Sequence, residues 1–391
     1  MTRNDLLSWL HVHLAAGVGP KRFKLLMDVF GSPQKITKAS LSDLKYVPHL
    51  GPATARQIYE GLQSVDPESE LLAAEQAGVN IIPLTDDSYP QLLASCADPP
   101  AILYVKGELK EQDQLSLAVV GTRRPCHYGN EQAYRFGYLL AQAGIAVVSG
   151  LARGIDGQAH RGAMLAKGRT IAVLGCGLGQ IYPPEHKDLA DEIIRQNGAI
   201  ISEYPMNIQP TAGNFPARNR IVSGMTLGTL VVEAPLQSGA LITAALATEY
   251  NREVFALPGP VDIPNFQGCH QFIKSGKAKL ITSLEDILDE LGQVGTILKS
   301  ETKSLTKTSR DRKGAGKELP SKQNDTLSNL FQAALSPAEK TIWDFLGHGP
   351  NDTDTICQLC NLKAAEVSAT LTTLQLKGLV KLLPGNQFTR R

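Results

Sequence analysis

Residues 116–125 read SLAVVGTRRP, and this stretch decides how the middle of the chain folds. Its apolar run is too short for a helix and too continuously apolar to leave one face in water. Similar runs recur with stretches of helical length between them: IAVVSG at 145–150, TIAVLG at 170–175, AIISE at 199–203, TLVVEA at 229–234, EVFALPG at 253–259 and AKLIT at 278–282. This alternation predicts an α/β core, a parallel sheet covered by helices on both faces, with ligands at the carboxyl ends of its strands.

Two glycine–proline turns punctuate residues 1–70. Gly17-Val18-Gly19-Pro20 and Leu50-Gly51-Pro52 each precede helix-forming residues, which predicts a small domain of two helical hairpins. Such turns present backbone N–H groups to a DNA phosphate, in the manner of a helix-hairpin-helix. A plain helical bundle with glycine caps gives the same pattern, so both interpretations stay open.

The composition of the sequence changes twice within the last hundred residues. Residues 292–332 are rich in Lys, Ser and Thr and nearly free of large apolar side chains, which predicts a flexible basic linker. A helix opens at Ser336-Pro337, further helices are expected at 353–359 and 364–377, and 379–388 reads as a hairpin. We predict four segments: a helical domain at 1–70, the α/β core at 71–291, the linker at 292–332 and a winged-helix domain at 333–391. The third helix of the winged domain is poor in basic residues, so it suits a protein partner at least as well as DNA.

The composition limits the class of protein. Lys and Arg number 39 and Asp and Glu 38, for a net charge of +1, so any contact with nucleic acid must come from local clusters. No stretch has the length and apolarity of a signal peptide or a membrane span, and we expect a cytoplasmic protein without a membrane partner. The six cysteines are scattered, which is typical of reduced thiols, and the single CxxC at 357–360 lacks further zinc ligands.

The first candidate site follows the opening strand. Gly121 ends that strand, and Arg123 and Arg124 come next, so a phosphate can approach the glycine backbone while guanidinium groups donate to it. The loop after the second strand is again built from small residues and contains Gly150 and Arg153. For Arg123 and Arg124, the alternative is that they pair with carboxylates of the core.

An aromatic and basic cluster precedes a later helix. Phe215-Pro216-Ala217-Arg218-Asn219-Arg220 combines a ring for base stacking with guanidinium groups for phosphates, which is what sequence-tolerant binding of single strands requires. Phe215 as ordinary core filler is the alternative. Ser238 and Gly239 open another helix and direct its free N–H groups at the expected cleft.

Catalytic motifs are missing from the sequence. We find no HExxH, no Walker loop and no Ser/His/Asp order, and the GCGLG stretch at 175–179 only loosely matches a dinucleotide fingerprint. We therefore predict no catalytic residues, no metal and no cofactor.

With these residues in view, the chain resembles the DNA-processing protein A family (DprA/Smf), known from natural transformation. The resemblance covers roughly residues 80–275 and rests on ordered motifs: GTRRP, SGLARGIDGQAH, TIAVLGCGLGQIYP, FPARNRIVSG, VVEAPLQSGALITA and VFALPG. It implies an extended Rossmann-like fold, a homodimer, binding and protection of single-stranded DNA, and loading of the RecA recombinase, with single-strand binding protein as a further candidate partner. Carried over by motif, the DNA pocket uses Gly121, Arg123, Phe215, Arg218, Asn219 and Arg220, assisted by Ser238 and Gly239.

Two rival functions remain. Rossmann-like phosphoribohydrolases hydrolyse nucleotides with a PGGxGTxxE loop at the corresponding place, which here reads PLQSGALITA and lacks the glutamate needed for acid–base chemistry. The other rival is a regulator that binds duplex DNA through the winged helix. Only the mediator of recombination combines a preference for single strands, strong salt dependence and no turnover of nucleotides.

Overall fold

A computed structural model describes residues 1–292, 337–346, 351–360, 362, 367, 370, 371, 374, 380–383 and 387–390. The chain divides into two compact units, residues 1–310 and 311–391, and each is described by itself. The linker that we predict at 292–332 lies, apart from Gly292, outside the described residues.

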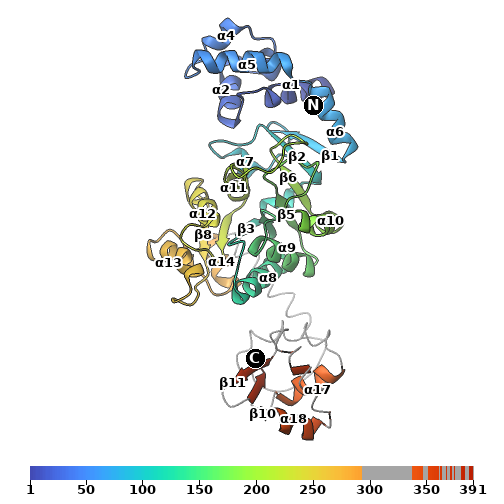
Figure 1. Cartoon of the computed structure of the whole chain (residues 1–391). Coiled ribbons are helices and arrows are strands. Elements are labelled where there is room, and N and C mark those ends of the chain that lie inside the picture. The colour runs from blue at the N-terminus through green and yellow to red at the C-terminus, as the bar shows by residue number, and fades with distance from the viewer. Residues whose placement is uncertain are drawn as a thin grey trace. The chain divides into compact units, whose positions relative to one another are not determined.

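Six helices form the N-terminal part of the first unit (Figure 1). They are α1 (Arg3–Leu14), α2 (Pro20–Phe30), α3 (Pro33–Ile36), α4 (Leu41–Lys45), α5 (Pro52–Ser64) and α6 (Pro67–Gln76). The two glycine–proline turns act as predicted, because α2 and α5 begin at Pro20 and Pro52, directly after N-cap glycines. The boundary that we predict at residue 70 falls inside α6.

The core of this unit is a nine-stranded sheet, which confirms the predicted α/β class. In order across the sheet the strands are β1 (Val79–Pro83), β2 (Ile102–Gly107), β6 (Ala199–Ser202), β5 (Thr170–Val173), β4 (Ala146–Ser149), β3 (Ser116–Val120), β7 (Gly228–Val231), β8 (Glu253–Ala256) and β9 (Lys279–Leu280). The seven strands from β3 to β9 pair in parallel, while β2 pairs antiparallel with both β1 and β6.

Helices cover both faces of the sheet, as the continuously apolar strands predict. Along β3, Leu117 and Val119 pack with α8 (His127–Gln142), α9 (Ile155–Leu165) and α14 (Leu284–Glu290). Ala118 and Val120 point to the opposite face, toward α11 (Asn214–Gly224), α12 (Gly239–Glu249) and α13 (Gln267–Lys274). Shorter helices complete the unit: α7 (Gln91–Ala94), α10 (Lys187–Arg195) and the 3-10 turns η1 (Glu111–Gln114), η2 (Pro184–His186) and η3 (Pro264–Phe266).

The order of the strands fixes where a ligand can bind. From β3 the chain adds β4, β5 and β6 on one side, and then returns to place β7 on the other side of β3. The connections after β3 and β7 therefore diverge and leave a crevice at the carboxyl ends of these strands. Ligands of open parallel sheets bind at such a switch point.

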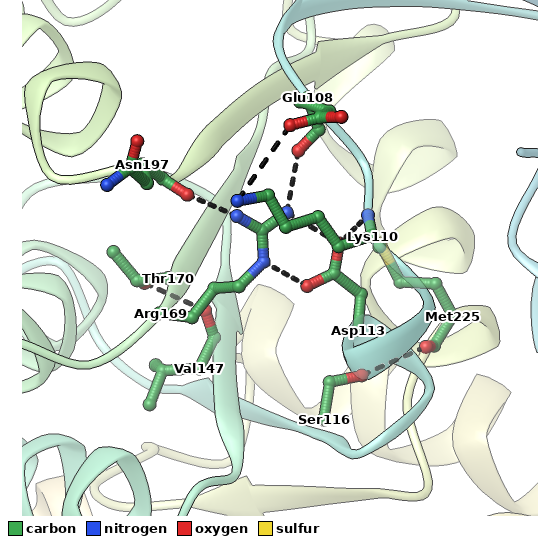
Figure 2. Close-up of polar contacts among 9 residues, drawn as sticks. All are labelled: Glu108, Lys110, Asp113, Ser116, Val147, Arg169, Thr170, Asn197 and Met225. Carbon is green, nitrogen blue, oxygen red and sulfur yellow. Dashed lines mark hydrogen bonds and ion pairs between the residues drawn. The ribbon is translucent and has the colours of Figure 1, made fainter.

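The opposite end of the sheet carries a polar cluster around Arg169, directly before β5 (Figure 2). Its guanidinium pairs with the buried carboxylate of Asp113 and donates to the carbonyl oxygens of Glu108 and Asn197. These bonds fasten the β2–β3 and α10–β6 connections to one arginine. Because the cluster lies at the amino ends of the parallel strands, its role is structural and separate from the switch point.

The N-terminal helices share an apolar cluster with the sheet. Trp9, Leu10 and Val12 of α1 belong to the same cluster as Tyr104 of β2 and Met206 after β6. A carboxylate oxygen of Glu70 in α6 also accepts a hydrogen bond from the Met206 backbone at 2.7 Å. The helices are therefore packed against the α/β core.

The second unit contains α17 (Pro337–Phe345), β10 (Asn351–Asp352), α18 (Thr353–Cys360), β11 (Val380–Leu383) and β12 (Gln387–Arg390). The strands form an antiparallel sheet in the order β10-β12-β11, and β11 and β12 make the predicted hairpin. The described residues between α18 and β11 include Val367, Leu371 and Leu374, which are helical and buried with Trp343 and Phe388. This arrangement is the winged-helix pattern that the sequence predicts.

Candidate nucleic-acid interface

A cleft of about 730 Å³ opens at the switch point between β3 and β7. Its walls come from the loops after β3, β4 and β5, from the connection between β6 and α11 with the first turns of α11, and from the connection between β7 and α12. Among the residues that line it are Gly121, Thr122, Arg123, Arg124, Gly150, Asp156, Tyr182, Phe215, Arg218, Asn219, Gln237, Ser238 and Gly239. Loops that are far apart in the sequence therefore meet where the fold predicts a ligand.

A cation and two rings form one wall of the cleft. The guanidinium carbon of Arg123 lies 5.1 Å from the centre of the half-buried Phe215 ring. Tyr182 packs against the same ring, with 5.3 Å between the ring centres and 34° between their planes. Arg123 itself is exposed, so its charge faces solvent beside an aromatic surface. In this wall the cation lies over the face of the Phe215 ring.

Arg218 forms the floor of the cleft. It is 4% exposed, and its Nη1 donates to the Gly150 carbonyl oxygen at 2.7 Å. Burial lowers the pKa of Arg218 to about 10, although the nearby Asp156 opposes this shift. Its Nε finds no hydrogen-bond partner within the described part of the chain. Arg218 is thus a charged group taken out of water that keeps a donor unused.

Asp156 is the counter-charge below Arg218. The pKa of Asp156 is raised overall, because burial outweighs the opposing effects of Arg218 and of the backbone N–H groups of Gly150 and Ala152. These two N–H groups donate to one carboxylate oxygen at 3.1 and 3.3 Å. A Cβ at position 150 would lie 2.4 Å from the Arg218 guanidinium, so only glycine leaves room for this pair.

The first turn of α12 borders the cleft. Ser238 caps the helix, since its hydroxyl accepts a hydrogen bond from the Ala240 N–H at 3.2 Å. Asn219 donates from its amide to the Gly239 carbonyl oxygen at 3.2 Å and so ties α11 to α12. The positive end of the helix dipole therefore faces the cleft, where it favours an anion.

Glu233 holds the loop that carries Arg123 and Arg124. This fully buried carboxylate accepts hydrogen bonds from the backbone N–H and the thiol of Cys126, at 3.0 and 3.2 Å, at the start of α8. Asn265 donates both to Glu233 and to the Arg124 carbonyl oxygen. The loop is fixed at its end, so its arginines project from a defined backbone.

Two arginines of the predicted site have other partners. Arg220 is not among the residues that line the cleft: it is 8% exposed, forms an ion pair with the buried Glu203 and donates to the Asp98 carbonyl oxygen at 2.8 Å. Pairing with a core carboxylate was an alternative considered for Arg123 and Arg124, and it is Arg220 that the structure places in such a pair. Arg153 is exposed, pairs with Glu185 and lines a small pocket that adjoins the cleft. The other predicted residues, Gly121, Arg123, Arg124, Gly150, Phe215, Arg218, Asn219, Ser238 and Gly239, all line the cleft.

Gly121 is also required by the packing of the protein itself, which the sequence did not predict. A Cβ at this position would lie 2.5 Å from Ile155 and 2.8 Å from the Glu233 carbonyl oxygen. Close packing between β3, β7 and α9 thus demands glycine whether or not a ligand is present. Tyr182 and Asp156 line the cleft but were not assigned to it from the sequence, although an aromatic residue beside a glycine loop was a usable signal for Tyr182.

The described residues show neither a metal-binding cluster nor a membrane-spanning helix. Among the described residues, no group of three His, Cys, Asp or Glu side chains is arranged to hold a metal ion. In the same part of the chain, no helix combines the length and the apolarity needed to cross a bilayer.

Comparison with known proteins identifies the family. Residues 80–292 match the family described as DNA recombination-mediator protein A, residues 331–386 match the DprA winged helix domain, and residues 15–64 match the SAM-like helix-hairpin-helix tandem. These matches confirm the predicted types of the two flanking domains, a helix-hairpin-helix domain and a winged-helix domain.

Individual relatives agree with this assignment. The chain is 34% identical to Protein Smf of Synechocystis sp. over the full length of both chains, and 39% identical to Protein Smf of Escherichia coli over 83% of this chain and 81% of the relative. The X-ray structure of DNA processing protein A from Streptococcus pneumoniae superposes with a TM-score of 0.62 and 33% identity, covering 74% of this chain and 98% of that one. The chain belongs to the DNA recombination-mediator protein A family.

Proposed function

We propose that the cleft at the switch point binds single-stranded DNA. The observation that carries this proposal is the wall made of Arg123, Phe215 and Tyr182, in which a cation lies 5.1 Å from the centre of a half-buried ring. Stacking of a base on such a ring contributes about 1 to 3 kcal/mol, and it tolerates any base because every base has a π face. The neighbouring guanidinium is placed to bind the phosphate of the same nucleotide.

The recessed position of the rings favours a single strand over a duplex. In a duplex the base faces are stacked on each other and only the base edges reach the grooves. A ring that lines a cleft can stack on a base only if that base is already exposed. Arg124 and the first turn of α12 add phosphate contacts around the same hollow.

The biological role that we propose is mediation of recombination in the cytoplasm. The protein would act as a homodimer that covers incoming single strands, protects them and delivers them to the RecA recombinase, with single-strand binding protein as a further partner. Membership of the recombination-mediator family supports this role. A direct test is whether the protein speeds the assembly of RecA on strands precoated with single-strand binding protein.

We propose binding without catalysis. Asp156, the carboxylate at the floor of the cleft, accepts two backbone hydrogen bonds and faces Arg218. This arrangement shapes a loop and leaves the carboxylate without the role of a general base. Incubation with nucleoside monophosphates should release no free nucleobase detectable by chromatography. Release that depends on Asp156 would favour the hydrolase alternative.

The binding proposal is tested by fluorescence anisotropy with labelled single-stranded and duplex oligonucleotides of equal length. We expect a preference for the single strand, and a loss of about 1 to 3 kcal/mol of binding free energy in Phe215→Leu. Arg123→Gln should reduce the slope of log K against log salt by about 0.7, as expected for one phosphate contact. Arg135→Gln is the matched control, because Arg135 also lies beside a ring, that of Phe136, but outside the cleft. Preference for the duplex, or normal binding by both cleft variants, would refute the proposal.

A further inference from the structure

An exposed ion pair lies beside the aromatic wall of the cleft. It joins Arg153, in the loop after β4, to Glu185 in η2, and the two side chains are 54% and 48% exposed. Arg153 lines the small pocket that adjoins the cleft, together with Arg123, Tyr182 and Phe215. These last three residues also line the cleft, so a ligand of the cleft has Arg153 as a neighbour.

The segment that carries Glu185 is fixed on both sides. Tyr182 packs against the Phe215 ring, with 5.3 Å between the ring centres. His186 is buried, and its Nδ1 donates to the Leu151 carbonyl oxygen at 2.9 Å. The Glu185 carboxylate is thereby held beside the loop after β4. Arg153 has a long side chain with many rotamers, so it can exchange its partner while the backbone stays in place.

The pair occupies a cation that the pocket otherwise presents to an anion. Within the described part of the chain, Asp156 is the one carboxylate that lines the cleft or the small pocket, and it faces Arg218. Glu185 lines neither hollow, so it leaves room for a phosphate and acts only through the guanidinium of Arg153. An exposed ion pair is weak because both charges remain in water, and a phosphate oxygen accepts from a guanidinium as a carboxylate oxygen does.

We propose that Glu185 competes with a phosphate of the single strand for Arg153. In the DNA-free protein the carboxylate holds the guanidinium. When a strand lies in the cleft, a phosphate replaces the carboxylate on Arg153, and Glu185 is released to solvent. The inference rests on the proposed function of the cleft and adds a residue that opposes binding. Glu185 reserves the Arg153 contact for a strand that Phe215 and Arg123 already hold, because only a tethered phosphate has a high local concentration.

The test is fluorescence anisotropy of the full chain with a labelled oligothymidylate of about 12 nucleotides, within the range that single-strand-binding folds cover. The variants are Glu185→Gln, Arg153→Gln and the two combined. Glu185→Ala, which removes the hydrogen bond as well as the charge, guards against an amide that still holds Arg153. Glu68→Gln is the matched control, because it removes the same charge from another exposed ion pair, that of Glu68 with Arg3, which does not line the cleft.

We expect Glu185→Gln and Glu185→Ala to bind the strand about two- to fivefold more tightly than the wild type, the range that an exposed ion pair accounts for. This gain should disappear when Arg153→Gln is combined with Glu185→Gln. In the Glu185→Gln background, the loss of Arg153 should also lower the slope of log K against log salt by about 0.7, as expected for one phosphate contact. Glu68→Gln should bind like the wild type.

Three results separate the possible failures. If Arg123→Gln and Phe215→Leu both bind normally, the proposed function of the cleft is wrong and the competition for Arg153 falls with it. If these two variants weaken binding but neither Glu185 variant tightens it, the competition alone is overturned. If Glu185→Gln tightens binding equally with and without Arg153, the gain is a general effect of charge, and the proposal is likewise overturned.

Discussion

Glu233 shows how one buried side chain controls the exposed arginines of the cleft. Its carboxylate lies against Gly129, where a Cβ would come within 1.8 Å of an oxygen, and it receives donors from Cys126 and Asn265. Within the described part of the chain, its hydrogen-bond donors are uncharged groups: the N–H and thiol of Cys126, the N-cap of α8, and the amide of Asn265. Glu233 therefore positions the loop and does not itself contact a ligand in the cleft.

Replacing Glu233 by Gln should lower the free energy of unfolding by about 1 to 3 kcal/mol, because an amide group then faces donors that need an acceptor. The affinity for single strands should fall as well, since Arg123 loses its fixed backbone. Urea denaturation and anisotropy measure the two effects. Glu249→Gln, an exposed change on α12, is the control, and equal stability of the two variants would contradict this role.

Arg220 is expected to affect stability and not DNA contact. Its ion pair with Glu203 is about nine-tenths buried on both sides. Arg220→Gln leaves the Glu203 charge buried without its partner, which should cost about 3 to 5 kcal/mol of the free energy of unfolding. Once corrected for the folded fraction measured by circular dichroism, affinity for single strands should be unchanged. A folded variant with clearly weaker binding would contradict this prediction and show that Arg220 takes part in DNA binding.

His160 makes the stability of the core depend on pH. It is fully buried with Nδ1 2.7 Å from the Thr170 hydroxyl, and burial, followed by the positive charges of His186, Arg161 and Arg218, lowers its pKa from 6.5 to about 3. The folded protein therefore cannot take the proton that the unfolded chain binds below pH 6.5. Its stabilising contribution is complete above pH 6.5 and is lost between pH 6.5 and about 3, by up to about 1.4 kcal/mol per pH unit.

His160→Asn should reduce this slope. Urea unfolding of the wild type and the variant at pH 7 and pH 5 gives the comparison, and the difference between the two proteins should shrink at pH 5. A difference that stays constant between the two pH values would mean that His160 does not titrate on unfolding.

At the scale of single residues, the sequence predicts contacts that are local and fails where burial decides. Phe215 and Arg218 occupy one short motif, so their common location could be anticipated. Arg220 belongs to the same motif, but its side chain points to Glu203, and nothing in the order of residues distinguishes it from Arg218. The glycine loop beside Tyr182 marks this residue as a candidate, but its contact with Phe215 depends on the folded loop and could not be predicted from the local pattern.

At the scale of helices and strands, the parallel part of the sheet was predictable because strands β3 to β7 are buried throughout. Strands β3 to β9 coincide with the apolar runs of the sequence. Strands β1 and β2 were not predicted individually. Their place in the sheet depends on antiparallel pairing with β6, which is remote in the sequence, and β1 exposes Asn80 and so lacks a continuous apolar pattern.

Helices α8 and α9 pack closely through glycine. A Cβ at Gly137 would lie 2.3 Å from the Ala159 carbonyl oxygen, so Gly137→Ala must push the helices apart. We expect a loss of about 1 to 3 kcal/mol in the free energy of unfolding, the usual cost of overpacking. Gly213→Ala is the control because a Cβ there meets no atom within 4 Å, and thermal unfolding should separate the two. Equal stability of both variants would disprove the packing argument.

At the scale of the whole molecule, the sequence predicts the kinds of domain better than the way they join. The N-terminal hairpins, the α/β core and the winged helix are all present. The apolar cluster that α1 shares with β2, through side chains such as Trp9 and Tyr104, could not be predicted, because each surface alone reads as an ordinary half-buried face. The exact boundaries between the four segments stay a prediction.

The central claim is that a single strand lies in the cleft between β3 and β7, and photo-crosslinking tests it most directly. An oligothymidylate that carries iodouracil is bound to the full chain and irradiated, and the modified peptides are mapped by mass spectrometry. We predict crosslinks at Tyr182 and Phe215, and their yield should fall in Arg123→Gln as binding weakens. Crosslinks confined to the winged-helix domain or to the N-terminal hairpins, with none in the cleft, would contradict the claim.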